Sequence, residues 1–100
     1  MNFSFHPEAE TEFNLAIDYY KDCAEGLGLD FSVEVYITIE RIIAYPKAWI
    51  VLEDEVRRCL TRRFPYGILY TIKNNSIFIL AVMNLHRDPD YWKYRLDDKN

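Results

Sequence analysis

Four arginines lie between positions 57 and 63 of this 100-residue chain, and no acidic residue separates them. The pattern predicts a strand here, and alternate residues of a strand share a face. Arg58 and Arg62 would then point one way, with Cys59 and Thr61 under the helices. Guanidinium groups match the geometry of phosphate and carboxylate. The cluster predicts an anion-binding surface, although each arginine could instead pair with a nearby acid.

A second group of candidate residues lies in the segment HRDPDYW, after a predicted buried strand. Histidine titrates near neutral pH, so His86 could move a proton, and Arg87 could stabilise negative charge on a phosphate. Tyr91 could stack on a base or close a cleft. Each residue also has a simpler structural interpretation. His86 would be a turn residue, Arg87 a partner of a neighbouring aspartate, and Trp92 an anchor for a short terminal helix.

The two halves of the chain carry opposite charge. Residues 1–55 hold 3 basic and 12 acidic side chains, a formal charge of −9, whereas residues 56–100 hold 9 basic and 4 acidic side chains, +5. The whole-chain value of −4 conceals this difference. Such segregation predicts one surface that attracts a polyanion or an acidic peptide.

Several classes of protein are not indicated. No apolar run approaches the roughly 18 residues of a membrane span, and the N-terminus lacks the pattern of a secretory signal, so we expect a cytoplasmic protein without a membrane partner. Cys23 and Cys59 are far apart and belong to no CxxC motif or histidine cluster. Neither a zinc site nor a disulfide framework is predicted. Since glycine-rich phosphate loops and hydrolase motifs are also missing, we expect no cofactor.

The first half predicts a strand followed by two helices. Phe3 and Phe5 alternate with polar residues, and Pro7 suits the first position of a helix. Apolar residues then recur at helical spacing until the glycines at 26 and 28, while residues Glu8 to Glu12 read as a solvated helix start. A second helix is predicted over residues 29–45, because this stretch is too long for a typical strand.

The second half predicts a sheet. Residues 47–55 are expected to form a loop held by Trp49, and strands are expected over 57–64, 67–73 and 76–83, with a turn at Asn74 and Asn75. A short helix is predicted over 90–96. The order β-α-α-β-β-β predicts an α+β fold in one domain over residues 1–100. A helical hairpin would pack on one face of a small, twisted, mainly antiparallel sheet and leave the other face partly open.

In order, the segments HPEAETEFNLAIDYY, GLGLDF, VRRCLTRRFPYGILYTI and AVMNLHRDPDYWKYR, with a helix ending at Tyr45 and Pro46, resemble the RelE/ParE superfamily of type II toxin–antitoxin toxins. The resemblance covers roughly residues 3–96. It implies a toxin of a plasmid-stabilisation type of module, held inactive by a cognate antitoxin whose flexible segment wraps it. It also implies contact with DNA only indirectly, through the antitoxin.

Two activities occur in this superfamily, namely cleavage of mRNA on the ribosome and inhibition of DNA gyrase. The ribonuclease branch usually has an arginine where this chain has Gly67, and a basic residue near the position of Leu85. Tyr91 does match the tyrosine of the C-terminal segment. These differences and the negative net charge favour the ParE-like branch, because docking into ribosomal RNA depends on positive charge.

The sequence therefore predicts a gyrase-binding toxin without catalysis of its own. The target- and antitoxin-binding residues would be Arg58, Arg62, Arg87 and Tyr91. The alternative is a metal-independent endoribonuclease acting on ribosome-bound mRNA, in which Arg87, Tyr91 and His86 would be catalytic. A third possibility is a degenerate toxin that only binds an antitoxin.

Overall fold

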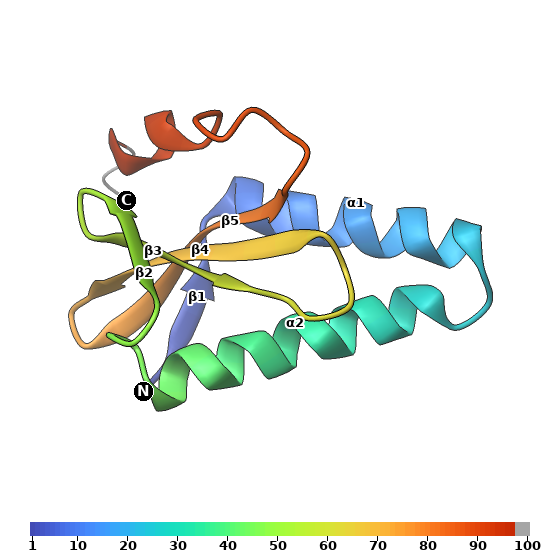
Figure 1. The fold of residues 1–100 in the computed structure, drawn as a ribbon, viewed down its shortest axis with the longest axis horizontal. Helices are drawn as coiled ribbons and strands as arrows, with labels where there is room; N and C mark the ends of the chain where they lie inside the picture. Colours follow the sequence, from blue (N-terminus) through green and yellow to red (C-terminus); the bar gives the residue numbers. More distant parts are fainter. Residues whose placement is uncertain (98–100) are drawn as a thin grey trace.

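The computed structural model describes residues 1–97 and places two helices against a five-stranded sheet (Figure 1). In chain order the elements are β1 (Phe3–Phe5), α1 (Pro7–Cys23), α2 (Leu27–Ala44), β2 (Ile50–Glu53), β3 (Val56–Leu60), β4 (Tyr66–Lys73), β5 (Ser76–Asn84) and the 3₁₀ helix η1 (Lys93–Asp97). The strand order is β1-β5-β4-β3-β2, and β1 runs parallel to β5 while the other neighbouring pairs are antiparallel. The predicted α+β fold is confirmed.

Helix α1 begins where its first residues satisfy its free N–H groups. The imidazole Nδ1 of His6 accepts a hydrogen bond of 3.0 Å from the backbone N–H of Glu8, and Pro7 occupies the first turn. Proline is suited to that position because its missing N–H would have no partner there. The buried face of α1 carries Ala9, Phe13 and Ala16 at helical spacing. His6 therefore caps helix α1.

Helix α2 begins two residues earlier than predicted. Gly26 precedes it with a φ of +80°, a conformation that favours glycine, and Gly28 lies inside the helix instead of ending α1. A Cβ atom at Gly28 would lie 2.8 Å from the backbone oxygen of Ile17, so the two helices meet closely here. Glycine is required at position 28 because the two helices are in close contact there. In the sequence alone, a glycine at this point looks like the end of a helix.

Strand β2 corrects the prediction of a loop over residues 47–55. Residues Ile50–Glu53 pair with β3, and the chain turns through Asp54 and Glu55 at φ values of 50° and 65°. Positive φ at both central residues is the geometry of a tight hairpin turn, which glutamate rarely occupies. The hairpin at Asn74 and Asn75, by contrast, has the residues expected for positive φ and was predicted correctly.

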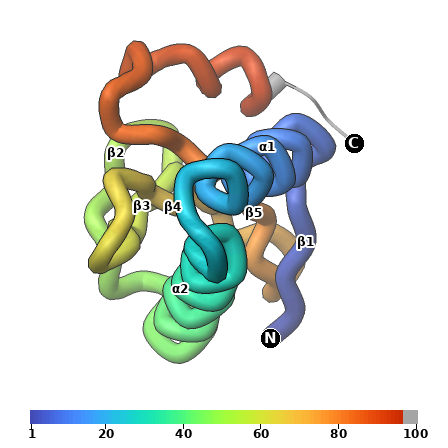
Figure 2. Tube along the Cα trace, turned by 90° about the vertical axis from the view of Figure 1, so that its right-hand side faces the viewer, coloured from blue at the N-terminus to red at the C-terminus, as the bar shows by residue number. Residues whose placement is uncertain are grey.

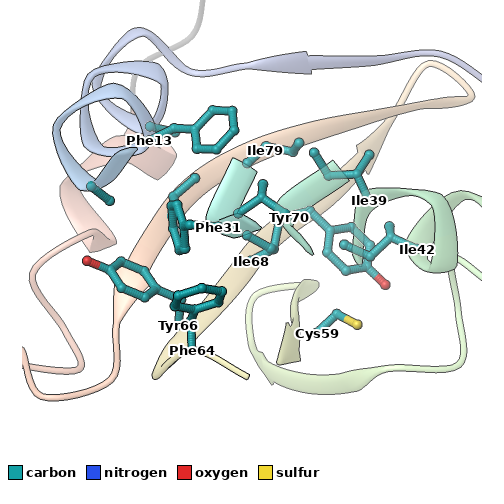
Figure 3. Close-up of a cluster of buried hydrophobic side chains, with 14 of the residues drawn as sticks. Phe13, Phe31, Ile39, Ile42, Cys59, Phe64, Tyr66, Ile68, Tyr70 and Ile79 are labelled. Atoms are coloured by element: carbon teal, nitrogen blue, oxygen red, sulfur yellow. The ribbon is translucent and has the colours of Figure 1, made fainter. Parts of the chain in front are cut away.

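Both faces of the sheet are covered, though by different segments. The two helices cover one face over a core that includes Phe31, Phe64 and Tyr66, whose rings pack edge to face (Figure 3). The C-terminal segment lies apart from α2 on the other side (Figures 1 and 2). There Trp92 is buried in a second cluster with Val56, Leu69, Leu80, Ala81 and Met83.

The C-terminal segment holds this position with little regular structure. The helix predicted over residues 90–96 is instead a series of turns followed by the short η1. The indole Nε1–H of Trp92 donates to the backbone oxygen of Pro89 at 2.6 Å, which closes the first of these turns. Trp92 therefore anchors the segment, as its structural interpretation predicted. Part of the sheet face that the sequence left open lies beneath it.

Candidate functional site

The side chains of Arg57 and Arg58, which are neighbours on strand β3, lie on opposite sides of the sheet. Arg57 lies on the helix side and donates from Nη1 to the backbone oxygens of Lys47 at 3.0 Å and Trp49 at 2.8 Å. Arg58 pairs across the sheet with Leu69, whose side chain belongs to the second cluster. Cys59 is buried in the core under the helices, as expected. Strand alternation thus separates Arg57 from Arg58.

Arg62 and Arg63 lie beyond the end of β3, which stops at Leu60 and not at residue 64 as predicted. The hydroxyl of Thr61 donates to the backbone oxygen of Phe64 at 2.7 Å and so closes a turn before β4. The carboxylate of Glu34 on α2 accepts hydrogen bonds from the backbone N–H groups of Arg62 and Arg63. The position of Arg62 is therefore set by this loop, and strand alternation does not apply to it.

A surface pocket of about 380 Å³ gathers three arginines at the corner between α2, β2 and β3. Its walls are Arg41, Ala48, Trp49, Ile50, Arg58, Leu60, Thr61 and Arg62. The structure thus brings Arg58 and Arg62 into one pocket. It adds Arg41, which sequence reasoning missed. The sequence could have indicated Arg41, because it follows the buried Thr38 by three residues and so lies near the same face of α2.

Arg41 is held in this pocket by contacts to its own chain. Its Nη2 donates to the backbone oxygen of Leu60 at 3.0 Å and to the hydroxyl of Thr38 at 3.2 Å. Its guanidinium carbon lies 5.7 Å from the centre of the Trp49 ring. These contacts hold the guanidinium group in place.

The stem of Arg58 packs closely against Gly67 of β4. A Cβ atom at Gly67 would lie 3.1 Å from both Cγ and Cδ of Arg58. This is tighter than most carbon contacts, so a larger residue at 67 would require Arg58 to move. Arg58 therefore occupies the space beside Gly67.

Arg87 and Tyr91 lie in a different pocket, of about 330 Å³, with Glu8, Thr11, Glu12, Tyr94 and Arg95. The guanidinium carbon of Arg87 lies 3.7 Å from the centre of the Tyr91 ring, and Arg87 Nη1 lies 3.5 Å from Glu12 Oε2. Arg87 and Tyr91, two of the four predicted binding residues, are thus in contact in the structure. His86 is exposed nearby, in a turn where its backbone N–H donates to Asn84 Oδ1 at 2.9 Å.

Glu12 organises this second pocket. The hydroxyl of Tyr91 donates to Glu12 Oε2 at 2.6 Å, and the buried Arg95 donates from Nη1 and Nη2 to both carboxylate oxygens at 3.0 and 2.9 Å. The backbone N–H of Val82 donates to Oε1 at 3.0 Å. The pKa of Tyr91 is raised, first by burial and then by its hydrogen bond to Glu12. Tyr91 is therefore held as a neutral phenol that points its proton at Glu12.

Glu12 and Arg95 were missed by sequence reasoning, which treated Glu12 as part of a solvated helix start. Only 14% of the Glu12 side chain and 4% of the Arg95 side chain are exposed. Glu12 follows Ala9 by three residues and precedes Ala16 by four, so it lies beside the buried stripe of α1. That spacing was the signal that could have indicated its burial.

Within residues 1–97 no three or more His, Cys, Asp or Glu side chains are grouped to hold a metal ion. No helix in the same range is both long and apolar enough to cross a bilayer.

No protein-family model and no curated protein matches the sequence. A solved structure described as the "Chromosomal ParDE TA system from P. aeruginosa" does contain a similar chain. The TM-score is 0.72 and the identity is 18%, over 86% of this chain and 97% of that one. The two chains share a fold. At this identity the likeness to the ParDE chain concerns the fold alone, and it agrees with the arrangement that the RelE/ParE resemblance implied.

Proposed function

We propose that this chain is the toxin of a toxin–antitoxin pair, held inactive by a cognate antitoxin in the cytosol. The observation that supports the proposal most strongly is the likeness in fold to the ParDE chain, which covers 86% of this chain and 97% of that one. The resemblance of residues 3–96 to RelE/ParE toxins supports it independently. In this proposal Arg58 and Arg62 contact the antitoxin, while Arg87 and Tyr91 contribute to binding of the antitoxin or the target.

The toxin acts by binding its target, and DNA gyrase is the target we propose. The environment of Tyr91 supports this mechanism over RNA cleavage. A general acid or base must exchange a proton with the reacting group, but the Tyr91 proton is directed to Glu12 and the pKa of its hydroxyl is raised. Arg87, the candidate for stabilising a phosphate, lies within ion-pair distance of the same carboxylate. The hydroxyl of Tyr91 is thus bonded within the chain, whereas the side chain of Arg87 is half exposed and stays accessible to a protein partner.

The second candidate is ribosome-dependent cleavage of mRNA. One observation favours it, because two of the residues expected to be catalytic, Arg87 and Tyr91, are in direct contact. In this case Arg87 would bind the scissile phosphate and Tyr91 or His86 would move a proton. Glu12 would have to release both Arg87 and Tyr91 when RNA binds.

The two mechanisms differ in what expression of the chain does to a bacterial cell. Induction of the chain alone should stop growth and induce a DNA-damage response, while primer extension finds translated messages intact. Purified chain should inhibit supercoiling by purified gyrase. Co-expression of the protein encoded beside it should restore growth.

Other outcomes of the same assays would contradict the proposed mechanism. Cut messages together with unaffected supercoiling would show the ribonuclease instead. Harmless expression together with a stable complex between the chain and its neighbour's product would leave only a binding module.

A further inference from the structure

Three buried N–H groups around one pocket have no hydrogen-bond partner within the described residues. They are Nε of Arg41, Nε1 of Trp49 and Nε of Arg58. The side chains come from α2, from the segment before β2 and from β3, yet all three line the pocket of about 380 Å³ described above. Segments distant in the sequence therefore contribute the same kind of unsatisfied group to one place.

Unsatisfied buried groups are unfavourable, and each costs about 1–3 kcal/mol when no acceptor is present. The side chains of arginine and tryptophan donate hydrogen bonds and accept none. The three groups cannot satisfy one another, because every one of them is a donor. A ligand for this pocket must supply acceptors, and an ionised carboxylate or phosphate has several acceptor sites and no donor.

The charge around the pocket favours an anion as well. Arg62 joins Arg41 and Arg58 in the lining, and no aspartate or glutamate is part of it. Glu34, which lies on α2, bonds to the backbone N–H groups of Arg62 and Arg63 and is not part of the pocket lining. Arg63 itself turns toward Asp30, 3.7 Å from its Nη2.

The rest of the pocket wall favours a peptide over a nucleic acid. Ala48, Ile50 and Leu60 supply apolar surface, and Ile50 and Leu60 are 60% and 44% exposed. Apolar side chains beside an acidic residue would cover this surface, whereas a sugar-phosphate backbone would not. The net charge of −4 also disfavours a long polyanion, whose binding depends on neutralising many phosphates.

We propose that the Arg41–Trp49–Arg58 pocket receives the side-chain carboxylate of an acidic residue flanked by apolar residues in a partner peptide. The partner is the antitoxin, a point that rests on the proposed function. The three unpaired N–H groups lie beneath the pocket surface, so their side chains shift to present them to the carboxylate, and the neighbouring apolar side chains pack on Ile50 and Leu60. The hydrogen bonds of Arg41 Nη2 to Leu60 and Thr38 keep the guanidinium group beside the pocket.

Titration with short peptides, followed by NMR of the ¹⁵N-labelled chain, tests the pocket directly. The probe is the acetylated pentapeptide amide Ser-Leu-Glu-Leu-Ser, and its glutamine counterpart is the control ligand. The indole N–H signal of Trp49 should move downfield with the glutamate peptide and much less with the glutamine peptide. The signal of Trp92 should stay in place, because its N–H is already bonded to Pro89.

Matched variants distinguish the contribution of the Arg58 Nε–H group to peptide binding from the contribution of its charge. Arg58→Lys keeps the charge and part of the stem but removes Nε–H, so it should weaken peptide binding by about tenfold or more, as expected for a hydrogen bond to a charged group. Arg63→Lys, outside the pocket, should change affinity less than about twofold. The amide spectrum of each variant verifies that it is folded.

The other outcomes overturn the proposal. Equal shifts with both peptides, or no shift of Trp49, would show that the pocket does not bind a carboxylate. Tighter binding of a short RNA or of inorganic phosphate would assign it to phosphate. The growth assay reports on the toxin separately, so peptide binding without toxicity would refute the proposed function and leave the pocket. Toxicity without peptide binding would refute the proposed pocket and leave the proposed function standing.

Discussion

The carboxylate of Glu12 joins three segments of the fold. It connects α1 to β5 through the N–H of Val82 and to the C-terminal segment through Arg95 and Tyr91. Taking an ion pair out of water is unfavourable unless further hydrogen bonds satisfy both partners. Both oxygens of Glu12 are so satisfied, and Arg95 also donates from Nη1 to the backbone oxygen of Leu80 at 2.9 Å. Replacing Glu12 by an uncharged residue would leave the guanidinium group of Arg95 charged and buried without this partner.

We therefore expect Glu12→Ala to destabilise the fold by about 3–5 kcal/mol, the usual cost of leaving a buried charge without its partner. The free energy of unfolding from urea titration measures this change. Glu10→Ala is the matched control, because Glu10 lies on the exposed side of the same turn and should change stability by less than about 1 kcal/mol. Similar losses in the two variants would show that Arg95 finds another partner.

At the scale of elements, the close approach of α1 and α2 depends on Gly28. Within a helix, alanine is normally more stable than glycine by about 1 kcal/mol. At position 28, however, a Cβ atom would lie 2.8 Å from the Ile17 oxygen and 3.0 Å from the Lys21 Cβ. The first contact is with backbone, which cannot rotate away. The helices would have to separate, and the core between them and the sheet would loosen.

Gly28→Ala should consequently lower the free energy of unfolding by about 1–3 kcal/mol, opposite to its effect on an isolated helix. Thermal and urea unfolding measure this. The control is Glu40→Ala, at an exposed position of the same helix, which should be close to neutral. An increase in stability on Gly28→Ala would show that the helices adjust at little cost.

At the scale of the whole molecule, the burial of Tyr70 makes the fold less stable as the pH rises above 10. Burial raises the pKa of Tyr70 from 10.0 to about 12, and its hydroxyl donates to the backbone oxygen of Pro46 at 2.6 Å. The folded state thus keeps a proton that the unfolded chain releases. The stability that this provides is fully present below pH 10 and is lost as pH rises from 10 to 12.

The free energy of unfolding from urea titration should fall by about 2–3 kcal/mol between pH 10 and pH 12 as Tyr70 loses its proton, because a tenfold change in proton affinity corresponds to about 1.4 kcal/mol. Tyr70→Phe should be about 1 kcal/mol less stable at neutral pH, because one hydrogen bond is lost. Its decline above pH 10 should be shallower than that of the original chain. Parallel curves for the two proteins would show that Tyr70 does not control the alkaline transition.

The sequence by itself determined the elements whose signals are local. Helix α1 was predicted from Pro7 and the spacing of Ala9, Phe13 and Ala16, and the β4–β5 hairpin from two asparagines that tolerate positive φ. These features depend on steric and hydrogen-bonding preferences within a few residues. The same local rules placed Cys59 in the core, on the opposite side of β3 from Arg58, because strand residues alternate.

The tertiary structure decided which distant residues meet. It formed β2 around a hairpin turn at Asp54 and Glu55, and it covered the second face of the sheet with the segment anchored by Trp92. It also divided the expected arginine site into a pocket built on Arg58 and Arg41 and another built on Glu12. Burial and ion pairing act between side chains that are neighbours only in space, and for that reason a local pattern cannot specify them.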